Sequence, residues 1–285
     1  MITRGVESIL ARSLLDPDFL DALMVDPNKS LSSYSLDDTT RREFLSADFA
    51  RIRAFSGFIC KVQHNYLWES FPATRKLLAV YGLEIDLFSR YRRIQLSQKR
   101  KHEERRESIL RFIEFLEVDL SSKRGAPFRL MRELLKHERA TWETRLSLGN
   151  IPAQTSTEAS MCELNWSRFQ RLTPVLCGPL AIRKFCYDPI PLAHLVVGDT
   201  FDYGKLPPRS PRILGYWGDR TTCQLRVLTL DRLTAGVLCW INGRRSVRKV
   251  IDCVRRSAKD ALKPRDFRGL FEDMVEARLL SLRGD

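Results

Sequence analysis

Histidine and cysteine are the residue types of this chain that could support a metal site or a catalytic nucleophile. The chain has four histidines and seven cysteines, and His102-Glu103-Glu104 begins like the zinc motif H-E-x-x-H but lacks the second histidine. No C-x-x-C pair occurs, and the glycine patterns of the P-loop, the dinucleotide fold and the serine-hydrolase elbow are absent. We therefore expect no catalytic residue, no metal site and no cofactor in this chain, so that it is not an enzyme by itself.

The net charge favours an anionic partner without choosing one. Lys and Arg exceed Asp and Glu by 13 among 285 residues, and such a basic surface attracts nucleic acid, anionic lipid or an acidic protein. The Arg-Arg pairs are scattered from Arg41-Arg42 to Arg255-Arg256, which argues against a basic tail that grips nucleic acid. No apolar run is long enough to span a bilayer, and no signal peptide is evident. We expect a cytoplasmic protein without a membrane partner.

The first half has the pattern of short helices that must pack on one another. Asp16-Pro17 and Asp26-Pro27 each place a capping carboxylate before a proline at the first helical position. Apolar residues recur with a helical period on either side of these breaks. We predict an all-helical domain over residues 1–149 and a domain linker over the polar, aperiodic stretch 150–160.

The second half, residues 161–285, changes from helical periodicity to short strands followed by helices. Strand-like runs lie at 180–187, 192–197, 212–217 and 224–230, and apolar helical faces lie at 233–241, 247–254 and 264–275. The predicted fold class is α+β: an N-terminal all-helical domain, then a small antiparallel sheet with a winged-helix-like unit of three helices.

Three stretches of the chain resemble parts of one kind of biosynthetic protein. They are the Asp-Pro region 15–36, His64-Asn65-Tyr66-Leu67-Trp68 with Phe71-Pro72 and Leu77-Leu78, and Val237-Leu238-Cys239-Trp240-Ile241-Asn242-Gly243 with the following Arg244-Arg245-Ser246-Val247. The first resembles a small helical module common in peptide natural-product pathways, and the second resembles the helical domain of proteins encoded beside multinuclear iron oxidases. The third is similar to the winged-helix element that binds leader peptides of ribosomally made, modified peptides.

The resemblance implies a partner subunit of a multinuclear non-haem iron oxidase, of the thiaglutamate type first and the methanobactin type second. In that family the oxidase is a TIM barrel that holds the iron and removes a carbon from the C-terminal cysteine of a precursor peptide. The partner subunit holds the leader of the peptide and docks on the barrel. We assign the docking role to the helical domain.

Peptide recognition by such a unit has a physical basis in the exposed edge of a sheet, to which an extended peptide can add as a strand. We predict this edge at 223–230, with Cys223, Leu225, Val227 and Thr229 beside the peptide. The predicted facing helix carries Phe267, Leu270, Phe271 and Met274, although the same residues could simply form the core. Three arginines could meet an acidic leader or could be solvated surface: Arg244, Arg245 and Arg248.

Two other functions are compatible with the sequence. A winged-helix nucleic-acid-binding regulator fits the net charge, and the second C-terminal helix would carry its cations, namely Arg248, Lys249, Arg255 and Arg256. Nucleic acid is nevertheless the less expected partner, because the basic residues are spread along the chain. An enzyme with a histidine-centred metal site is the third possibility.

Overall fold

The computed structural model describes residues 2–97, 105–149, 165–203, 205, 207–257 and 264–284. The chain divides into two compact units, Met1–Arg132 and Glu133–Asp285. The predicted α+β fold class is confirmed, because helices form the first unit and small antiparallel sheets occur in the second. The division lies inside helix α9 (Ala126–Gly149), whereas the sequence prediction ended the helical domain at residue 149. The predicted linker, 150–160, lies outside the described residues.

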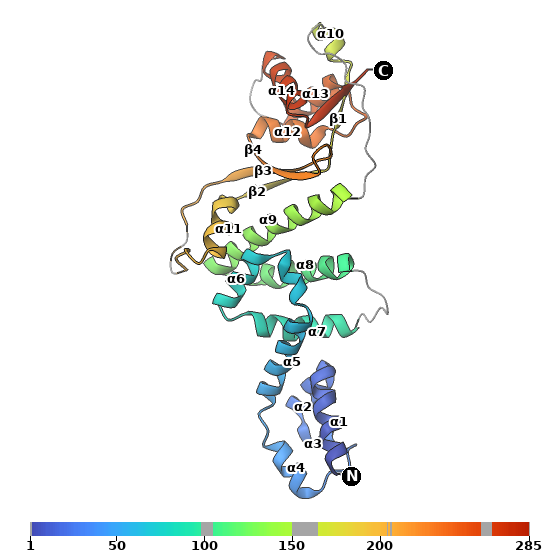
Figure 1. Cartoon of the computed structure of the whole chain (residues 1–285), viewed down its shortest axis with the longest axis vertical. Helices are drawn as coiled ribbons and strands as arrows, with labels where there is room; N and C mark the ends of the chain where they lie inside the picture. The colour runs from blue at the N-terminus through green and yellow to red at the C-terminus, as the bar shows by residue number, and fades with distance from the viewer. Residues whose placement is uncertain are drawn as a thin grey trace. The chain divides into compact units, whose positions relative to one another are not determined.

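The described part of the first unit consists of helices (Figure 1). Its helices before α9 are α1 (Ile2–Leu15), α2 (Pro17–Val25), α3 (Pro27–Leu31), α4 (Asp38–Leu45), α5 (Phe49–Gln63), the 3-10 helix η1 (Asn65–Glu69), α6 (Pro72–Val80), α7 (Glu84–Ser97) and α8 (Arg105–Ser122). Asp16 and Asp26 accept hydrogen bonds at 3.0 Å from the backbone N–H groups of Phe19 and Lys29, and a proline follows each aspartate. The predicted Asp-Pro starts are therefore confirmed.

An aromatic cluster lies in the core of this unit. The Phe112 ring lies 5.3 Å from Trp68 and 5.0 Å from Tyr91, both in edge-to-face arrangements, and it stacks on Phe88 at 5.5 Å. These four side chains are buried. Because they come from η1, α7 and α8, the three helices share one core.

The second unit contains two antiparallel sheets and the remaining helices. Its strands are β1 (Thr173–Leu176), β2 (Leu180–Phe185), β3 (Arg212–Asp219), β4 (Gln224–Leu230) and β5 (Leu280–Arg283). Its helices after α9 are α10 (Trp166–Phe169), α11 (Pro189–Val197), α12 (Arg232–Trp240), α13 (Val247–Ser257) and α14 (Pro264–Glu276). One sheet has the order β2-β3-β4, and the other pairs β1 with β5.

Both faces of the three-stranded sheet are covered (Figure 1). On one face, Leu214 and Tyr216 pack against Ala140 of α9. On the other, the sheet joins the larger core formed with α12, α13 and α14. The helix α9 approaches the sheet closely at Gly218, where an added Cβ would lie 2.6 Å from Leu148 Cγ.

One strand prediction is wrong. The run 192–197 was expected as a strand, but it belongs to α11, which is capped by Asp188 through a 3.3 Å hydrogen bond from the Ile190 N–H. The run is almost wholly apolar, so its pattern does not distinguish a strand from a buried helix. The preceding Asp188-Pro189 provides a helix N-cap and a proline at the first helical position, and the segment is therefore helical.

Among the helices that the structure describes, none combines the length and the apolar character needed to cross a bilayer.

Candidate functional site

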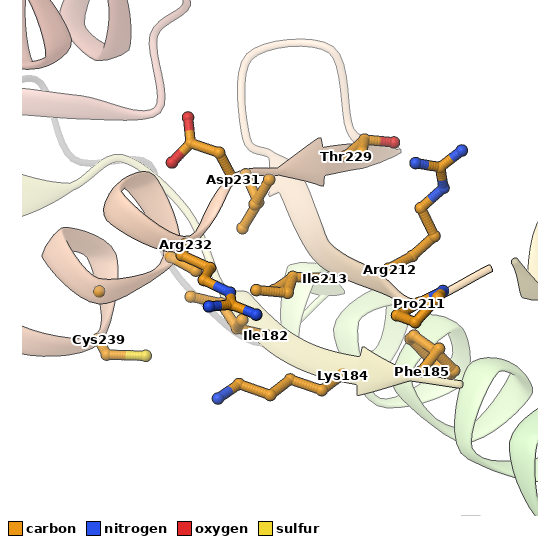
Figure 2. Close-up of a pocket in the computed structure, with 13 residues that line it drawn as sticks. Ile182, Lys184, Phe185, Pro211, Arg212, Ile213, Thr229, Asp231, Arg232 and Cys239 are labelled. Carbon is orange, nitrogen blue, oxygen red and sulfur yellow. The ribbon is translucent and has the colours of Figure 1, made fainter. Parts of the chain in front are cut away.

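A hollow of the second unit lies beside the three-stranded sheet, and we call it the groove. It has a volume of about 720 Å³ and is lined by the ends of β2, β3 and β4 and by the exposed side of α12 (Figure 2). This volume is in the range of pockets that hold a ligand or a peptide side chain.

Strand pairing and a helix cap set the shape of the groove. Lys184 of β2 pairs in register with Ile213 of β3, and Ile213 pairs with Leu230 of β4. Because side chains alternate along a strand, Ile182 and Lys184 point to the same face as these partners. The wall opposite is α12, whose start is fixed by Asp231: its carboxylate accepts hydrogen bonds from the backbone N–H and the hydroxyl of Thr234, at 2.7 and 3.1 Å.

The groove combines an apolar floor with a basic rim. Ile182 and Ile213 contribute to the floor, and Lys184, Arg212 and Arg232 contribute to the rim (Figure 2). Leu230 adds a further apolar side chain to the lining. Arg212 is partly neutralised by Asp188, whose carboxylate lies 3.2 Å from its Nε. Lys184 and Arg232 form no ion pair within the parts of the chain that the structure describes. The rim therefore favours an acidic ligand, and the floor favours an apolar side chain.

The predicted peptide edge is an edge strand. In the order β2-β3-β4, β4 pairs with β3 along one side, and no described strand pairs with its other side. Leu225 and Val227 are half-buried against the cluster that contains Ala140, so their side chains face α9. Cys223 is exposed in the turn before β4 with φ of 52°, and the exposed Thr229 lines the groove.

The predicted facing helix contributes to the core. Phe267 and Phe271 are 0% exposed and Met274 is 2% exposed, while Leu270 is half-buried against the same core. The ring of Phe271 meets Phe169 edge-on at 5.8 Å. Phe267, Phe271 and Met274 thus have almost no surface to offer to a peptide in this conformation, which agrees with the second interpretation of their apolar pattern, whereas Leu270 is only half-buried.

The three predicted arginines separate into two environments. Arg245 lies over the Trp240 ring at 5.0 Å and donates to the Trp240 carbonyl at 3.2 Å. Arg244 and Arg248 instead line a second hollow of about 400 Å³, together with Arg171 and Lys249. Sequence reasoning did not single out Arg171, because nothing local connects it with the α13 region.

A histidine–tyrosine pair lies between α9 and the sheet, with Tyr216 buried and His137 half-buried. His137 Nδ1 is 2.6 Å from the Tyr216 hydroxyl oxygen. Burial lowers the pKa of His137 to about 4 and raises the pKa of Tyr216, because both charged forms are desolvated. Both groups are consequently neutral near pH 7, and the hydrogen bond fixes α9 on β3.

A second histidine, His64 in the first unit, is buried. Its Nδ1 donates to the Cys60 carbonyl at 2.9 Å, and burial raises the pKa of the Cys60 thiol to about 11. A thiol with this pKa is protonated near neutral pH and is a poor nucleophile. In the described residues, no group of three or more histidine, cysteine or acidic side chains could hold a metal ion.

Apart from Thr229, sequence reasoning missed the residues of the groove, above all Lys184 and Arg232. The alternation of Ile182 and Lys184 could have indicated one shared strand face, but only the fold brings α12 beside that face. No protein-family model matches the chain, and a search of curated proteins finds none that matches it.

Proposed function

We propose that this chain is a non-catalytic subunit that binds an extended peptide along the second unit. The proposal rests mainly on one observation: β4 pairs with β3 on one side, and no described strand pairs with its other side. An extended peptide can form main-chain hydrogen bonds with such an edge, and neighbouring pockets then select its side chains. The groove supplies such a pocket, since Thr229 and Leu230 at the end of β4 line it.

The chemistry of the groove favours a peptide with an apolar side chain next to acidic ones. The floor, which includes Ile182 and Ile213, would bury the apolar side chain, and Lys184 and Arg232 would attract the carboxylates. Since α12 and the sheet already form the groove, binding would order the peptide more than the protein.

The finer proposal rests on the resemblance in the sequence. The peptide would be the leader of a ribosomally made precursor, and the chain would present its C-terminal cysteine to a TIM-barrel, multinuclear iron oxidase that removes a carbon from it. The thiaglutamate type is favoured over the methanobactin type. The iron would belong to the oxidase, and the helical unit would provide the docking surface. Presentation would accelerate the reaction by holding the cysteine near the metal.

The first experiment is a pull-down of the tagged full chain from a nuclease-treated native lysate, with identification of the bound material by mass spectrometry. Recovery of a small precursor peptide together with an iron-containing oxidase supports the finer proposal. Recovery of neither refutes it.

The second experiment tests the edge itself by hydrogen exchange. With a recovered peptide bound, the backbone amides of β4 should exchange more slowly, because they become hydrogen-bonded to the added strand. Thr229→Glu, beside the basic rim, should raise the Kd of an acidic peptide roughly tenfold, or about 1.4 kcal/mol. Thr222→Glu in the exposed turn is the matched control and should leave the Kd unchanged. Unaltered exchange in β4 would exclude strand addition there.

A further inference from the structure

The second hollow gathers positive charge that the peptide groove does not use. Arg171, Arg244, Arg248 and Lys249 line it, and all four side chains are exposed. None of them forms an ion pair with another residue in the described part of the chain. Ser167, Gln170, Thr173 and Ser246 complete a mostly polar lining.

Backbone hydrogen bonds hold these cations together. The N–H groups of Val247 and Arg248 donate to the carbonyls of Leu172 and Gln170, at 2.8 and 3.1 Å. Arg171 lies between these two acceptors, so it is fixed beside the first turn of α13. The side-chain oxygen of Asn242 accepts from the N–H groups of Arg244 and Arg245, both at 3.1 Å, which holds the preceding loop. The four cations are thus placed by folded backbone rather than by chance proximity of long side chains.

Charge continues beyond the hollow along the solvent face of α13. The exposed positions of this helix are Arg248, Lys249, Asp252, Arg255, Arg256 and Ser257. Four of them are basic and one is acidic. We call Arg171, Arg244 and these four cations of α13 the basic strip. A strip of this kind matches a row of phosphates better than one isolated anion.

We propose that the basic strip binds the phosphate backbone of duplex nucleic acid, an activity that goes beyond the proposed peptide binding. Arginine forks with serine, threonine and glutamine side chains are the groups that proteins use on phosphates. The hollow has no aromatic side chain in its lining, and a platform for stacked single-stranded bases is therefore missing there. The lining also lacks the apolar pockets that would select peptide side chains.

The neighbouring helix α14 indicates that this binding reads no base sequence. In a winged-helix unit the third helix would enter the major groove. Here Arg268 is paired with Glu272 at 2.8 Å, and Asp273 and Glu276 are exposed beside them. Such a face repels phosphates, so contacts are confined to the strip and carry no sequence information.

The test measures the affinity of the purified full chain for a short fluorescein-labelled duplex DNA by anisotropy at several salt concentrations. If the six cations of the basic strip neutralise six phosphates, log K should fall with log salt with a slope of about −5.4. The double variant Arg248→Gln/Lys249→Gln should make the slope shallower, about −3.6, and the affinity in about 0.1 M salt should fall about 60-fold.

The matched control removes the same charge elsewhere. Arg124→Gln/Arg129→Gln changes two exposed arginines of the first unit and should leave the slope unchanged. An equal loss in both double variants would show that net charge, not the strip, attracts DNA, and a flat salt dependence of the unaltered chain would also overturn the proposal. Equal displacement of the duplex by polyglutamate, at the same charge concentration, would assign the strip to an acidic polypeptide instead.

Two further readouts complete the test. A duplex of the same length but a different base sequence should bind with the same Kd. A strong preference for one sequence would contradict contacts that are limited to phosphates. Exchange protection of β4 by a recovered peptide should be the same in Arg248→Gln/Lys249→Gln, so that failure of the strip and failure of the peptide proposal are separate results.

Discussion

The hydrogen-bonded pair His137–Tyr216 should make the stability of the second unit depend on pH. The pKa of His137 is lowered from 6.5 to about 4 by burial, so the unfolded chain binds a proton that the folded unit does not bind between these values. The free energy of unfolding is therefore not reduced by His137 above about pH 6.5, and it falls progressively as the pH drops from 6.5 toward 4, because the unfolded chain gains the proton first. A shift of this size corresponds to about 3 kcal/mol, of which about 2 kcal/mol is lost between about pH 7 and pH 5.

The assay is urea unfolding at pH 7 and pH 5, followed by tryptophan fluorescence, with Trp217 as a buried reporter in the sheet. The variant His137→Asn keeps a polar group near the Tyr216 hydroxyl but cannot titrate. It should be less stable than the unaltered chain at pH 7, yet it should lose about 2 kcal/mol less on acidification to pH 5. Few carboxylates titrate in this interval, so the difference between the two proteins isolates the histidine. Equal losses in both proteins would refute the assignment of a neutral His137.

Three further predictions follow from the core, a cap and a thiol. Phe271→Ala should destabilise the second unit by about 3–5 kcal/mol, because it opens a cavity beside Phe169, and a smaller cost in urea unfolding would show that α14 is not core. Asp231→Ala should cost about 1 kcal/mol by removing the cap of α12, and a loss in thermal unfolding no larger than that of a surface control would contradict the cap. Cys60 should resist a thiol reagent at pH 7 while the exposed Cys239 reacts; equal rates in the folded chain would disprove its burial.

Local signals explain the part of the fold that was predictable. The Asp16-Pro17 and Asp26-Pro27 starts depend on one side chain and the N–H group three residues later, so they are decided within a single turn. The short strand-like runs at 212–217 and 224–230 likewise predicted β3 and β4, because such runs and the turn between them are visible within a few neighbouring residues. The run 192–197 was misassigned because a uniformly apolar segment has no period to read.

The candidate site was only partly predictable. The edge strand β4 and the cations Arg244 and Arg248 were identified, since strand patterns and charges are visible in the sequence. The groove was not identified, because Lys184 and Arg232 line the same hollow only when α12 packs against the sheet. Phe267 and Met274 show the opposite case: an apolar helical face looks the same whether it lines a groove or fills a core.

By itself the sequence determined the fold class, the helix starts and the basic character of the surface, because composition and short-range periodicity decide these properties. Tertiary structure alone decided which charges act together. Arg171 and Arg248 are distant in the sequence, and they become neighbours through the hydrogen bonds that tie the first turn of α13 to the segment before β1. Contacts between distant segments depend on packing, and packing is not encoded in any local pattern.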